Sequence, residues 1–519
     1  MIPRGRRPSL APYQRQPLPA LLEATAGRLP GKAALIGTDG RGYSYAQLWT
    51  AARGLARFLQ REAGVRRGDT VAIVSPNCPE YAVAVYGALL AGAKVTGLNP
   101  LFREREITAQ LTDADAVVAF AARSLLVGLG VTRGRLPTLR RVEAIEEVGS
   151  LAGDITTAPE VAAIDPDQDL AFLPYSSGTT GMPKGVMLTH ASLVTNTRQW
   201  ISTGAICEDS VQLAFLPFYH IYGAVVLLHA TVAMGATCVV MPRFDPAQVL
   251  ELIERYRVTE LYVVPPALLA LAHHPATDRH DLSSLRFIAS AAAPLPREVA
   301  TVAADRLRCP VFQCYGMTEA CPTHINPPDA WRDGSVGLPL PDVEQRIVDL
   351  ETGAEVPVGA TGELLVRGPQ VMRGYWKQPA ATAEAILAGG WVRTGDIARL
   401  DADGFLWLVD RAKEMIKYKG YQVAPAELEA VLMEHPAVLD AAVIPILMPG
   451  EGEAPKGFVV LKDGRQATAA AIMAFVAERV APYKQLRALE AIGEIPKGPT
   501  GKILRRVLVE QDRARTSTT

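Results

Sequence analysis

The sequence predicts an α/β protein with a large N-terminal domain of parallel-type sheets and covering helices, a β-rich subdomain, and a small α+β C-terminal domain. Three observations lead to this prediction. Apolar runs alternate with helical segments early in the chain, short strands rich in glycine and proline follow after about residue 340, and two short amphipathic helices lie near the C-terminus. The 519 residues also exceed what one hydrophobic core usually serves, so at least two domains are expected.

The N-terminal part alternates between strands and helices. Thr70–Val74 (TVAIV) predicts a buried strand, and Pro79–Ala91 predicts a helix with proline in its first turn. Lys94–Gly97 and Ala116–Phe120 predict two more strands, with a helix over Arg103–Leu111 between them. This βαβαβ order indicates a parallel sheet covered by helices. Further strands of the same kind are predicted at Thr237–Met241, Leu261–Val264 and Arg286–Ile288.

The composition and the length of the predicted elements change in the last third of the chain. Gly362–Gly368 (GELLVRG) and Gly404–Arg411 (GFLWLVDR) predict short strands of a β-rich subdomain that closes the large domain. Apolar residues at helical spacing then predict helices over Pro425–Glu434 and Thr468–Val480. We place the domain boundary near Asp410–Lys413, which predicts an N-terminal domain of residues 1–410 and a C-terminal domain of residues 411–519.

Composition excludes several classes of function. Lys+Arg (53) almost cancels Asp+Glu (54), so no global charge favours nucleic acid or an anionic membrane. The six cysteines form no CxxC pair, which argues against a zinc site or a disulfide framework and fits a cytoplasmic protein. The N-terminus lacks a clean apolar run, so no signal peptide is predicted.

One uncharged stretch, Ile221–Met241, is long enough to span a bilayer. Its pattern instead favours a buried helix, a turn near Gly235 and a buried strand, because a covered parallel sheet needs a helix followed by a strand. No transmembrane segment is therefore expected.

The segment Tyr175–Gly185 (YSSGTTGMPKG) has the composition of a phosphate-binding loop and follows a predicted strand at Leu170–Leu173. Glycines allow backbone N–H groups to approach an anion closely, hydroxyls add donors, and Lys184 adds a positive charge. The loop differs from a Walker A motif because Pro183 stands near its end, where that motif has glycine, lysine and a hydroxyl residue.

In the form SSGTTGxPKGV, this loop resembles the signature of the adenylate-forming superfamily, which includes acyl-CoA synthetases, coumarate–CoA ligases, firefly luciferases and the adenylation domains of peptide synthetases. The resemblance covers essentially the whole chain, in order. It continues in YGMTE at 315–319, TGD at 394–396, DRAKEMIKYKGYQVAPAELE at 410–429 and PKGPTGKILRR at 496–506.

The resemblance implies a two-step ligase that uses ATP, Mg²⁺ and coenzyme A. A carboxylic acid and ATP would give an acyl-adenylate and pyrophosphate, and CoA would then take the acyl group and release AMP. The small C-terminal domain would be mobile and would adopt a different pose for each step, with the DRAK segment as its hinge. No nucleic acid partner is expected, and the protein is expected to be a monomer or a homodimer.

The resemblance also implies where the nucleotide and metal bind. Asp396 is expected to accept hydrogen bonds from the ribose hydroxyls, and Tyr315 is expected to stack on adenine. Arg411 would add charge near the ribose and phosphate, with a salt bridge in the domain linker as the alternative. Glu319 would hold Mg²⁺ together with Thr180, since hard cations prefer oxygen ligands. The full ATP/AMP set is Ser176, Ser177, Gly178, Thr179, Thr180, Lys184, Ala292, Gln313, Tyr315, Gly316, Thr318, Asp396, Arg411, Lys413 and Gln422.

Four residues are implied to be catalytic: Lys502, His220, Thr318 and Glu319. Lys502 would bridge the substrate carboxylate and the α-phosphate, two anions that repel each other unless a cation neutralises them. His220 would gate the mouth of the acyl pocket without transferring a proton. In the second pose, the C-terminal domain would present Lys419 and Gly420 to CoA.

The acid-binding pocket is expected to involve His220, Tyr222, Val226, Ala289, Ala291, Cys314, Gly316 and Met317. By the resemblance, coumarate-type ligases carry lysine at the position of Ala289, and members of the superfamily commonly carry glycine at the positions of Ala291 and Cys314. These departures narrow an apolar pocket and disfavour specific recognition of a hydroxycinnamate. The expected substrate is therefore a medium- or long-chain fatty acid or a simple aryl acid.

Several alternatives stay open from the sequence. The acceptor of the acyl group could be an amine or a carrier-protein thiol instead of CoA. A luciferase-like oxygenase and an inactive sensor of nucleotide or acyl-CoA are further alternatives, although the presence of Lys184, Glu319, Asp396 and Lys502 argues against an inactive protein.

Overall fold

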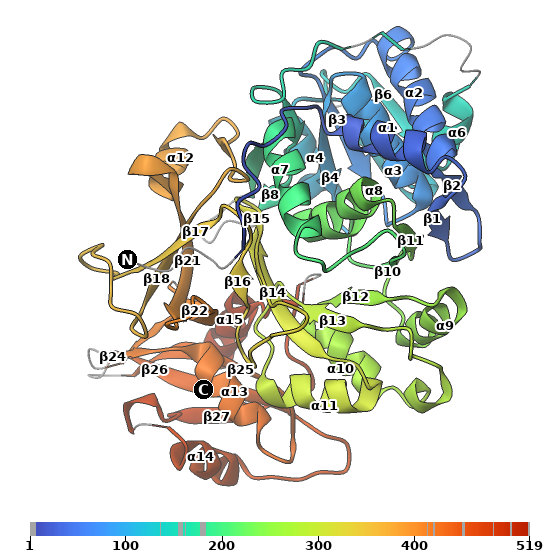
Figure 1. Ribbon diagram of the computed structural model, residues 1–519. Helices are drawn as coiled ribbons and strands as arrows, with labels where there is room; N and C mark the ends of the chain where they lie inside the picture. The colour runs from blue at the N-terminus through green and yellow to red at the C-terminus, as the bar shows by residue number, and fades with distance from the viewer. Residues whose placement is uncertain are drawn as a thin grey trace.

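Four β-sheets organise the chain in the computed structural model, which describes residues 7–134, 136–153, 159–160, 162–176, 183–412, 414–418, 421–448, 452–480, 482–498 and 501–516. Two large sheets form the body of the N-terminal domain, a third forms a small antiparallel subdomain, and the fourth forms the C-terminal domain (Figure 1). The expected α/β class and the order of its parts are confirmed.

The first large sheet is parallel through its centre and antiparallel at both ends. Its strand order is β16 (Leu338–Pro339), β15 (Cys321–Ile325), β14 (Val311–Met317), β13 (Phe287–Ser290), β12 (Glu260–Val263), β10 (Val211–Ala214), β11 (Thr237–Val240), β1 (Ala33–Gly37) and β2 (Gly42–Ser44).

The second sheet begins with two antiparallel strands and continues as a parallel sheet. Its order is β19 (Gly374–Tyr375), β9 (Lys184–Thr189), β7 (Leu170–Phe172), β4 (Lys94–Leu98), β3 (Thr70–Val74), β5 (Ala116–Ala121) and β6 (Arg141–Ala144), and β8 (Tyr175–Ser176) pairs with β9.

The side chains of strand β3 show that both faces of the second sheet are covered. All five of its residues are buried, and successive side chains of a strand point to opposite faces. Val71 and Ile73 belong to the main core, whereas Ala72 and Val74 belong to a separate core with residues of α4 and α5. An uninterrupted apolar run is therefore what this position requires.

Helices cover both large sheets. The main core joins α2, α3 and α7 to strands of both sheets. Helices α10 and α11 contribute to the same core and lie beside strands β12 to β14 (Figure 1). The α-helices are α1 (Pro19–Arg28), α2 (Tyr45–Arg61), α3 (Pro79–Leu90), α4 (Glu104–Asp113), α5 (Leu126–Arg133), α6 (Val148–Leu151), α7 (His190–Ile201), α8 (Ala230–Met234), α9 (Pro246–Tyr256), α10 (Pro265–His273), α11 (Arg297–Leu307), α12 (Pro379–Ala385), α13 (Pro425–Met433), α14 (Ala469–Ala477) and α15 (Arg505–Thr516).

The uncharged stretch after Ile221 forms the expected helix, turn and strand. Its first part is a π-helix, η3 (Gly223–His229), which continues into α8. Gly235 ends the helix with a left-handed φ of 84°, and β11 follows. Within the described residues, the structure contains no helix with the length and apolar character needed to cross a membrane.

The β-rich subdomain is an antiparallel sheet that packs at the end of the first large sheet. It contains β17 (Glu344–Val348), β18 (Thr361–Arg367), β20 (Ile386–Leu387), β21 (Trp391–Leu400) and β22 (Leu406–Arg411). Gly337 joins the two sheets through a bridge to Leu406, and its φ of 94° lies in the region that favours glycine.

The C-terminal domain has its own sheet and its own core. The sheet contains β24 (Tyr421–Val423), β23 (Ile416–Tyr418), β26 (Gly452–Leu461), β25 (Val438–Met448) and β27 (Ala488–Ala491). Leu428 and Leu432 of α13 pack in this core with Ile472 and Val476 of α14. The chain passes into this domain between the end of β22 and the start of β23, a segment that includes the predicted boundary, which stays a prediction.

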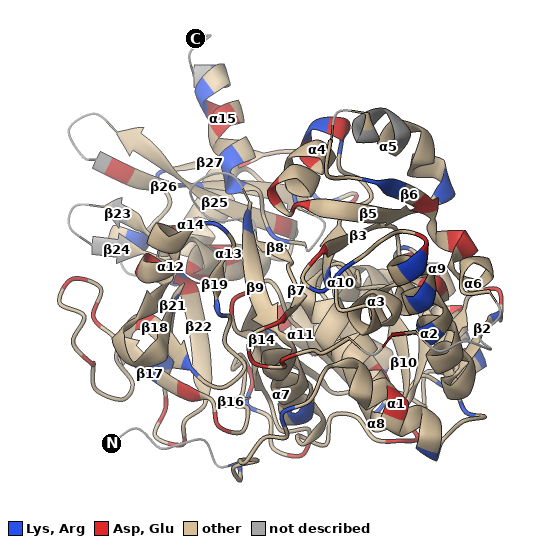
Figure 2. Ribbon diagram, turned by 90° about the horizontal axis from the view of Figure 1, so that it is seen from above, with Lys and Arg blue, Asp and Glu red and all other residues tan. Residues whose placement is uncertain are grey.

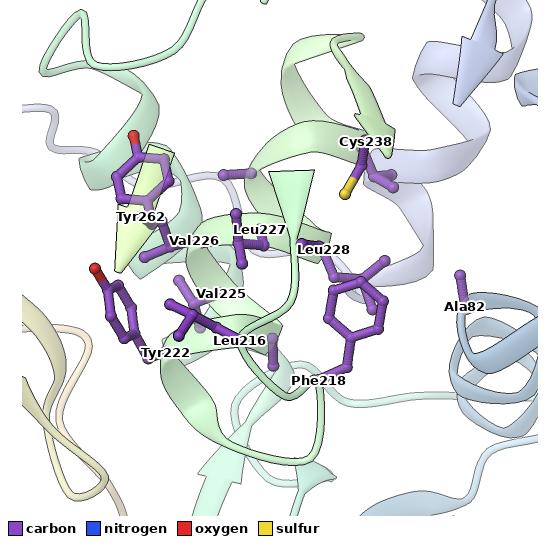
Figure 3. Close-up of a cluster of buried hydrophobic side chains, with 14 of the residues drawn as sticks. Ala82, Leu216, Phe218, Tyr222, Val225, Val226, Leu227, Leu228, Cys238 and Tyr262 are labelled. Carbon is purple, nitrogen blue, oxygen red and sulfur yellow. The ribbon is translucent and has the colours of Figure 1, made fainter. Parts of the chain in front are cut away.

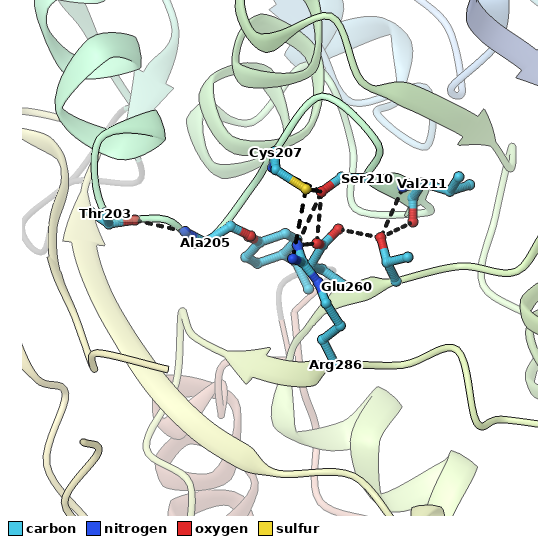
Figure 4. A network of polar contacts seen from close by, with 9 residues as sticks. Thr203, Ala205, Cys207, Ser210, Val211, Glu260 and Arg286 are labelled. Carbon is cyan, nitrogen blue, oxygen red and sulfur yellow. Dashed lines mark hydrogen bonds and ion pairs between the residues drawn. The ribbon is translucent and has the colours of Figure 1, made fainter. Parts of the chain in front are cut away.

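Charged residues of both signs are interspersed along both domains (Figure 2). One buried carboxylate, Glu260, lies at the first position of β12 and is fully paired (Figure 4). It accepts hydrogen bonds from Ser210 (2.8 Å) and Thr259 (2.7 Å) and forms an ion pair with Arg286. This network lies where β10, β12 and β13 begin, so it supports the fold at the edge opposite to their carboxyl ends.

Gly337→Ala tests the junction between the large sheet and the subdomain. A Cβ at this position would lie 2.2 Å from the backbone N of Asn326, in a conformation that alanine rarely adopts. We expect the free energy of unfolding to fall by at least about 1 kcal/mol. Thermal unfolding measures this, with Gly27→Ala as the control: a Cβ there meets nothing within 4 Å, and its melting temperature should equal or exceed that of the wild type.

Candidate functional site

Strand β14 and the turn after it carry several of the predicted site residues. Cys314 and Tyr315 lie on the strand, while Thr318 and Glu319 lie in the turn between β14 and β15. Because β14 runs parallel to β13, this turn lies at the carboxyl edge of the first sheet. Ligands of open α/β sheets usually bind at this edge.

Glu319 is the centre of the first cluster of site residues. Its Oε1 atom accepts hydrogen bonds from the hydroxyls of Ser176 (2.9 Å) and Tyr375 (2.9 Å), and the side chain is largely buried. The Nζ atom of Lys184 lies 5.0 Å from the centroid of the Tyr375 ring. The structure therefore brings together Ser176, Lys184 and Glu319, three residues predicted for phosphate and metal. The predicted residues Ser177, Gly178, Thr179 and Thr180 lie outside the described residues.

Sequence reasoning missed Tyr375. The residue lies 56 positions after Glu319, and no local pattern indicates that the two side chains meet. The contact depends on β19, which pairs with β9 so that Tyr375 stands opposite Val186.

Asp396 is the centre of a second cluster. Its carboxylate accepts a hydrogen bond from the Tyr315 hydroxyl (2.5 Å) and forms an ion pair with Arg411, whose Nε lies 2.7 Å from Oδ1. Burial raises the pKa of Asp396, while the positive charge of Arg411 and the Tyr315 hydroxyl oppose that rise. The three predicted nucleotide residues Tyr315, Asp396 and Arg411 thus meet in one place, with Arg411 paired inside the site.

Lys502 approaches this cluster from the C-terminal domain. Its Nζ lies 4.0 Å from Oε1 of Glu414, which also pairs with Arg505. Burial lowers the pKa of Lys502, the positive charge of Arg411 lowers it further, and Glu414 and Asp396 act in the opposite direction. Glu414 is a second residue that sequence reasoning missed.

The loop that carries Lys502 packs against the N-terminal domain. A Cβ added to Gly501 would lie 2.8 Å from Cδ of Pro266, at the start of α10, so the backbone of the loop approaches this helix closely. The C-terminal domain is therefore docked with the Lys502 loop directed at the carboxyl edge of the first sheet.

A further group of predicted residues belongs to the second pose of the C-terminal domain. Lys413, Lys419 and Gly420 lie outside the described residues. Gln422 lies on β24, where its backbone position is opposite Lys417 of β23. Their proposed roles stay predictions.

Tyr222 directly precedes the π-helix and contacts other predicted pocket residues; Figure 3 shows it with Val226 among buried hydrophobic side chains. The Tyr222 hydroxyl donates to the backbone oxygen of Ala289 (3.3 Å) and lies 3.7 Å from the Cys314 sulfur. Its backbone N donates to Nδ1 of His220 (3.2 Å). Burial lowers the pKa of His220 to about 4, so the imidazole is neutral at neutral pH. Val226, on the π-helix, is fully buried in the same core.

The remaining predicted residues flank β13 and β14. Ala292 lies two residues after the end of β13 and has a φ of 72°, a left-handed conformation that costs a non-glycine residue about 1–2 kcal/mol. Gln313 accepts a hydrogen bond from the backbone N of Leu295 (3.1 Å), while Gly316 is exposed and Met317 is partly buried. Ala291 is nearly buried beside Ala292.

The residues present fit a magnesium ion. Among the described residues, no three or more His, Cys, Asp and Glu side chains converge as a metal site. Both hydrogen bonds to Glu319 reach Oε1, and within the described part of the chain Oε2 has no partner. Mg²⁺ usually keeps several waters and binds through one or two carboxylates together with substrate phosphates, so one such oxygen near a lysine that is predicted to bind phosphate suits it.

Comparisons with known proteins show the family to which the chain belongs. Residues 22–376 match the model of the AMP-binding enzyme family, and residues 427–502 match the AMP-binding enzyme C-terminal domain. The chain is 39% identical to 4-coumarate–CoA ligase 5 of Oryza sativa subsp. japonica, over 97% of this chain and 96% of the relative.

Solved structures of the same kind superpose along almost the whole chain. ATP-bound MatB from Rhodopseudomonas palustris has a TM-score of 0.89 at 28% identity and covers 96% of this chain and 99% of its own. The anthranilate CoA ligase AuaEII in complex with anthranoyl-AMP has a TM-score of 0.88 at 29% identity and covers 96% of this chain and 97% of its own. The chain therefore belongs to the AMP-binding enzymes, the adenylate-forming superfamily, in the branch that contains the CoA ligases.

Proposed function

We propose that the protein is an ATP-dependent carboxylate–CoA ligase whose substrates are aromatic carboxylic acids. One observation carries the proposal: the short segment 314–319 contributes to three neighbouring groups of predicted site residues. Cys314 contacts Tyr222 of the predicted pocket, Tyr315 contacts Asp396, and Glu319 is the centre of the cluster with Ser176 and Lys184. An acid, a nucleotide and a metal ion bound at these three places would lie side by side.

In the first step, a carboxylate oxygen of the acid attacks the α-phosphorus of ATP. A new O–P bond forms, the bond to the β-phosphate breaks, and pyrophosphate leaves with the electron pair. The ammonium of Lys502 neutralises the two anions as they approach, and Lys184 binds the departing phosphates. Glu319 would hold a magnesium ion, which would supply further positive charge beside the phosphates.

In the second step, the CoA thiol attacks the acyl carbon of the adenylate, AMP leaves, and the thiol proton passes to solvent. We propose that residues 411–519 move as a unit for this step, which withdraws the Lys502 loop from Pro266. Lys419 and Gly420 would then line the path of CoA, with Lys413 and Gln422 near the phosphate of the adenylate. The docked Lys502 loop supports assigning the present arrangement to the first step.

Two lines of support lead to an aromatic acid. The predicted pocket contains Tyr222, whose ring packs edge-on against the ring of Tyr262 at a centroid distance of 6.5 Å, so one predicted pocket residue is an aromatic side chain held in place. The relatives and solved structures named above include ligases of 4-coumarate and anthranilate. Ala289 carries no polar side chain, and the Tyr222 hydroxyl already donates to its backbone. We therefore propose that a ring hydroxyl on the acid is tolerated without being required. A cytoplasmic location and a monomeric or dimeric state remain predictions.

A screen of acids tests the proposed substrate class. Pyrophosphate release would be measured with benzoate, cinnamate, 4-coumarate, octanoate and palmitate, each with and without CoA. Aromatic acids should give the highest kcat/KM. The ratio between 4-coumarate and cinnamate should stay below about 100-fold, because only a site built to bind the hydroxyl rejects its absence by 10⁴ or more.

The same screen separates the acceptors. CoA should give a thioester at a far higher rate than amines or a holo carrier protein. An equal or higher rate with an amine would contradict the CoA assignment while leaving the adenylation step intact. Octanoate turning over faster than every aromatic acid would contradict the proposed substrate class, and no acid-dependent pyrophosphate release at all would favour an inactive sensor.

Lys502→Ala should separate the two half-reactions. We expect pyrophosphate exchange to fall by about 10²–10³ or more, because one cationic group that stabilises the transition state is lost. Conversion of synthetic acyl-AMP and CoA to thioester should change little. The neighbouring cation Arg506 is largely exposed and pairs with Glu510, so Arg506→Ala is the matched control and should preserve both half-reactions. Equal loss of both half-reactions in Lys502→Ala would contradict the division.

Arg411→Gln should shift the pH dependence of ATP binding. As a carboxylate, Asp396 accepts hydrogen bonds at both oxygens, and protonation turns one of them into a donor, so ATP affinity falls as pH falls through the Asp396 pKa. Removing the Arg411 charge raises that pKa further, which moves the loss to higher pH. Calorimetric titration of ATP from pH 5 to 8 measures this, with Arg399→Gln as the control, since Arg399 is an exposed arginine on β21, the strand that carries Asp396. An unchanged pH profile in Arg411→Gln would show that this charge does not act on Asp396.

A further inference from the structure

We infer that Tyr375 is a positioning residue that holds the metal-binding carboxylate and the phosphate-binding lysine in fixed relation to each other. Its hydroxyl donates to Oε1 of Glu319 at 2.9 Å, and its ring centroid lies 5.0 Å from Nζ of Lys184. One side chain therefore contacts both groups. The inference rests on the roles proposed above for Glu319 and Lys184.

The hydroxyl restricts the rotation of the Glu319 carboxylate. Ser176 and Tyr375 both donate to Oε1, from β8 and β19 respectively, so rotating the carboxylate would break two hydrogen bonds. Oε2, which no described residue binds, is thereby held in one direction. Partners of this kind orient metal ligands, and losing one typically weakens metal binding by about 10–100-fold.

The Tyr375 ring restricts the conformational freedom of the Lys184 side chain. A lysine ammonium is a compact charge on a flexible four-carbon stem, so it loses conformational freedom when it binds phosphate. Attraction to the face of a tyrosine ring reduces that freedom in advance. Lys184 begins β9, which pairs with β19, so the lysine and the tyrosine stand on adjacent strands.

Tyr375 is itself firmly placed. Its backbone N donates to Oγ1 of Thr382 (2.9 Å), and the indole Nε1 of the next residue, Trp376, donates to the backbone oxygen of Asp113 (2.9 Å). The hydroxyl of Tyr175, next to Ser176, donates to the Asp113 carboxylate (2.6 Å). Both donors to Glu319 are thus adjacent in sequence to residues anchored on Asp113.

Two substitutions separate the contributions of the hydroxyl and the ring. Tyr375→Phe removes the hydroxyl and keeps the ring, so the affinity for Mn²⁺ in the presence of ATP should fall about 10-fold or more. The affinity for ATP without metal should be unchanged. Tyr375→Leu removes both, so ATP affinity without metal should fall as well. Tyr375→Met would replace the leucine variant if that variant fails to fold.

Mn²⁺ binding would be measured by electron paramagnetic resonance with saturating ATP and no acid, and ATP binding by calorimetry in EDTA. Tyr256→Phe, a tyrosine on α9 remote from these contacts, is the control for the loss of a hydroxyl. Wild-type Mn²⁺ affinity in Tyr375→Phe would overturn the role of the hydroxyl. Equal metal-free ATP affinity in Tyr375→Phe and Tyr375→Leu would overturn the role of the ring.

Glu319→Gln distinguishes a failure of this inference from a failure of the proposed function. If Glu319→Gln loses Mn²⁺ binding while Tyr375→Phe keeps it, only the positioning role of Tyr375 fails. If both variants keep wild-type Mn²⁺ affinity, Glu319 does not hold the metal, and the proposed site itself is wrong.

Discussion

The site depends on one constraint: a six-residue segment at the end of a parallel strand must serve three neighbouring clusters at once. Cys314, Tyr315 and Glu319 can do so because the chain leaves the strand at Met317 and turns sharply before β15. Hydrogen bonds from Tyr315 to Asp396 and from Ser176 to Glu319 connect this segment to the subdomain and to the second sheet. Movement of this segment would therefore disturb all three clusters together.

Much of the fold was predictable because local patterns decide it. Thr70–Val74 is apolar throughout since helices cover both faces of its sheet, and Gly235 marks the turn in the stretch after Ile221. Motifs were enough to propose Glu319, Asp396 and Lys502 as site residues, whereas the contacts of these residues came only from the structure.

The contacts of Tyr375 and Glu414 were not predictable, because each depends on how separate segments dock. Tyr375 reaches Glu319 only through the pairing of β19 with β9, and Glu414 reaches Lys502 only through the fold of the C-terminal domain. Hydrogen bonding and charge at a site are properties of the assembled elements, whereas the strands and helices themselves follow from short-range periodicity.

The π-helix beside Tyr222 has a consequence for how the proposed acid pocket could be altered. Each of its turns holds about one residue more than an α-helical turn, so deleting a residue there would restore ordinary helical geometry without breaking the flanking turns. Deleting one residue would thus rotate the side chains that follow it about the helix axis. A deletion within this one helix would therefore change which side chains face the proposed acid pocket.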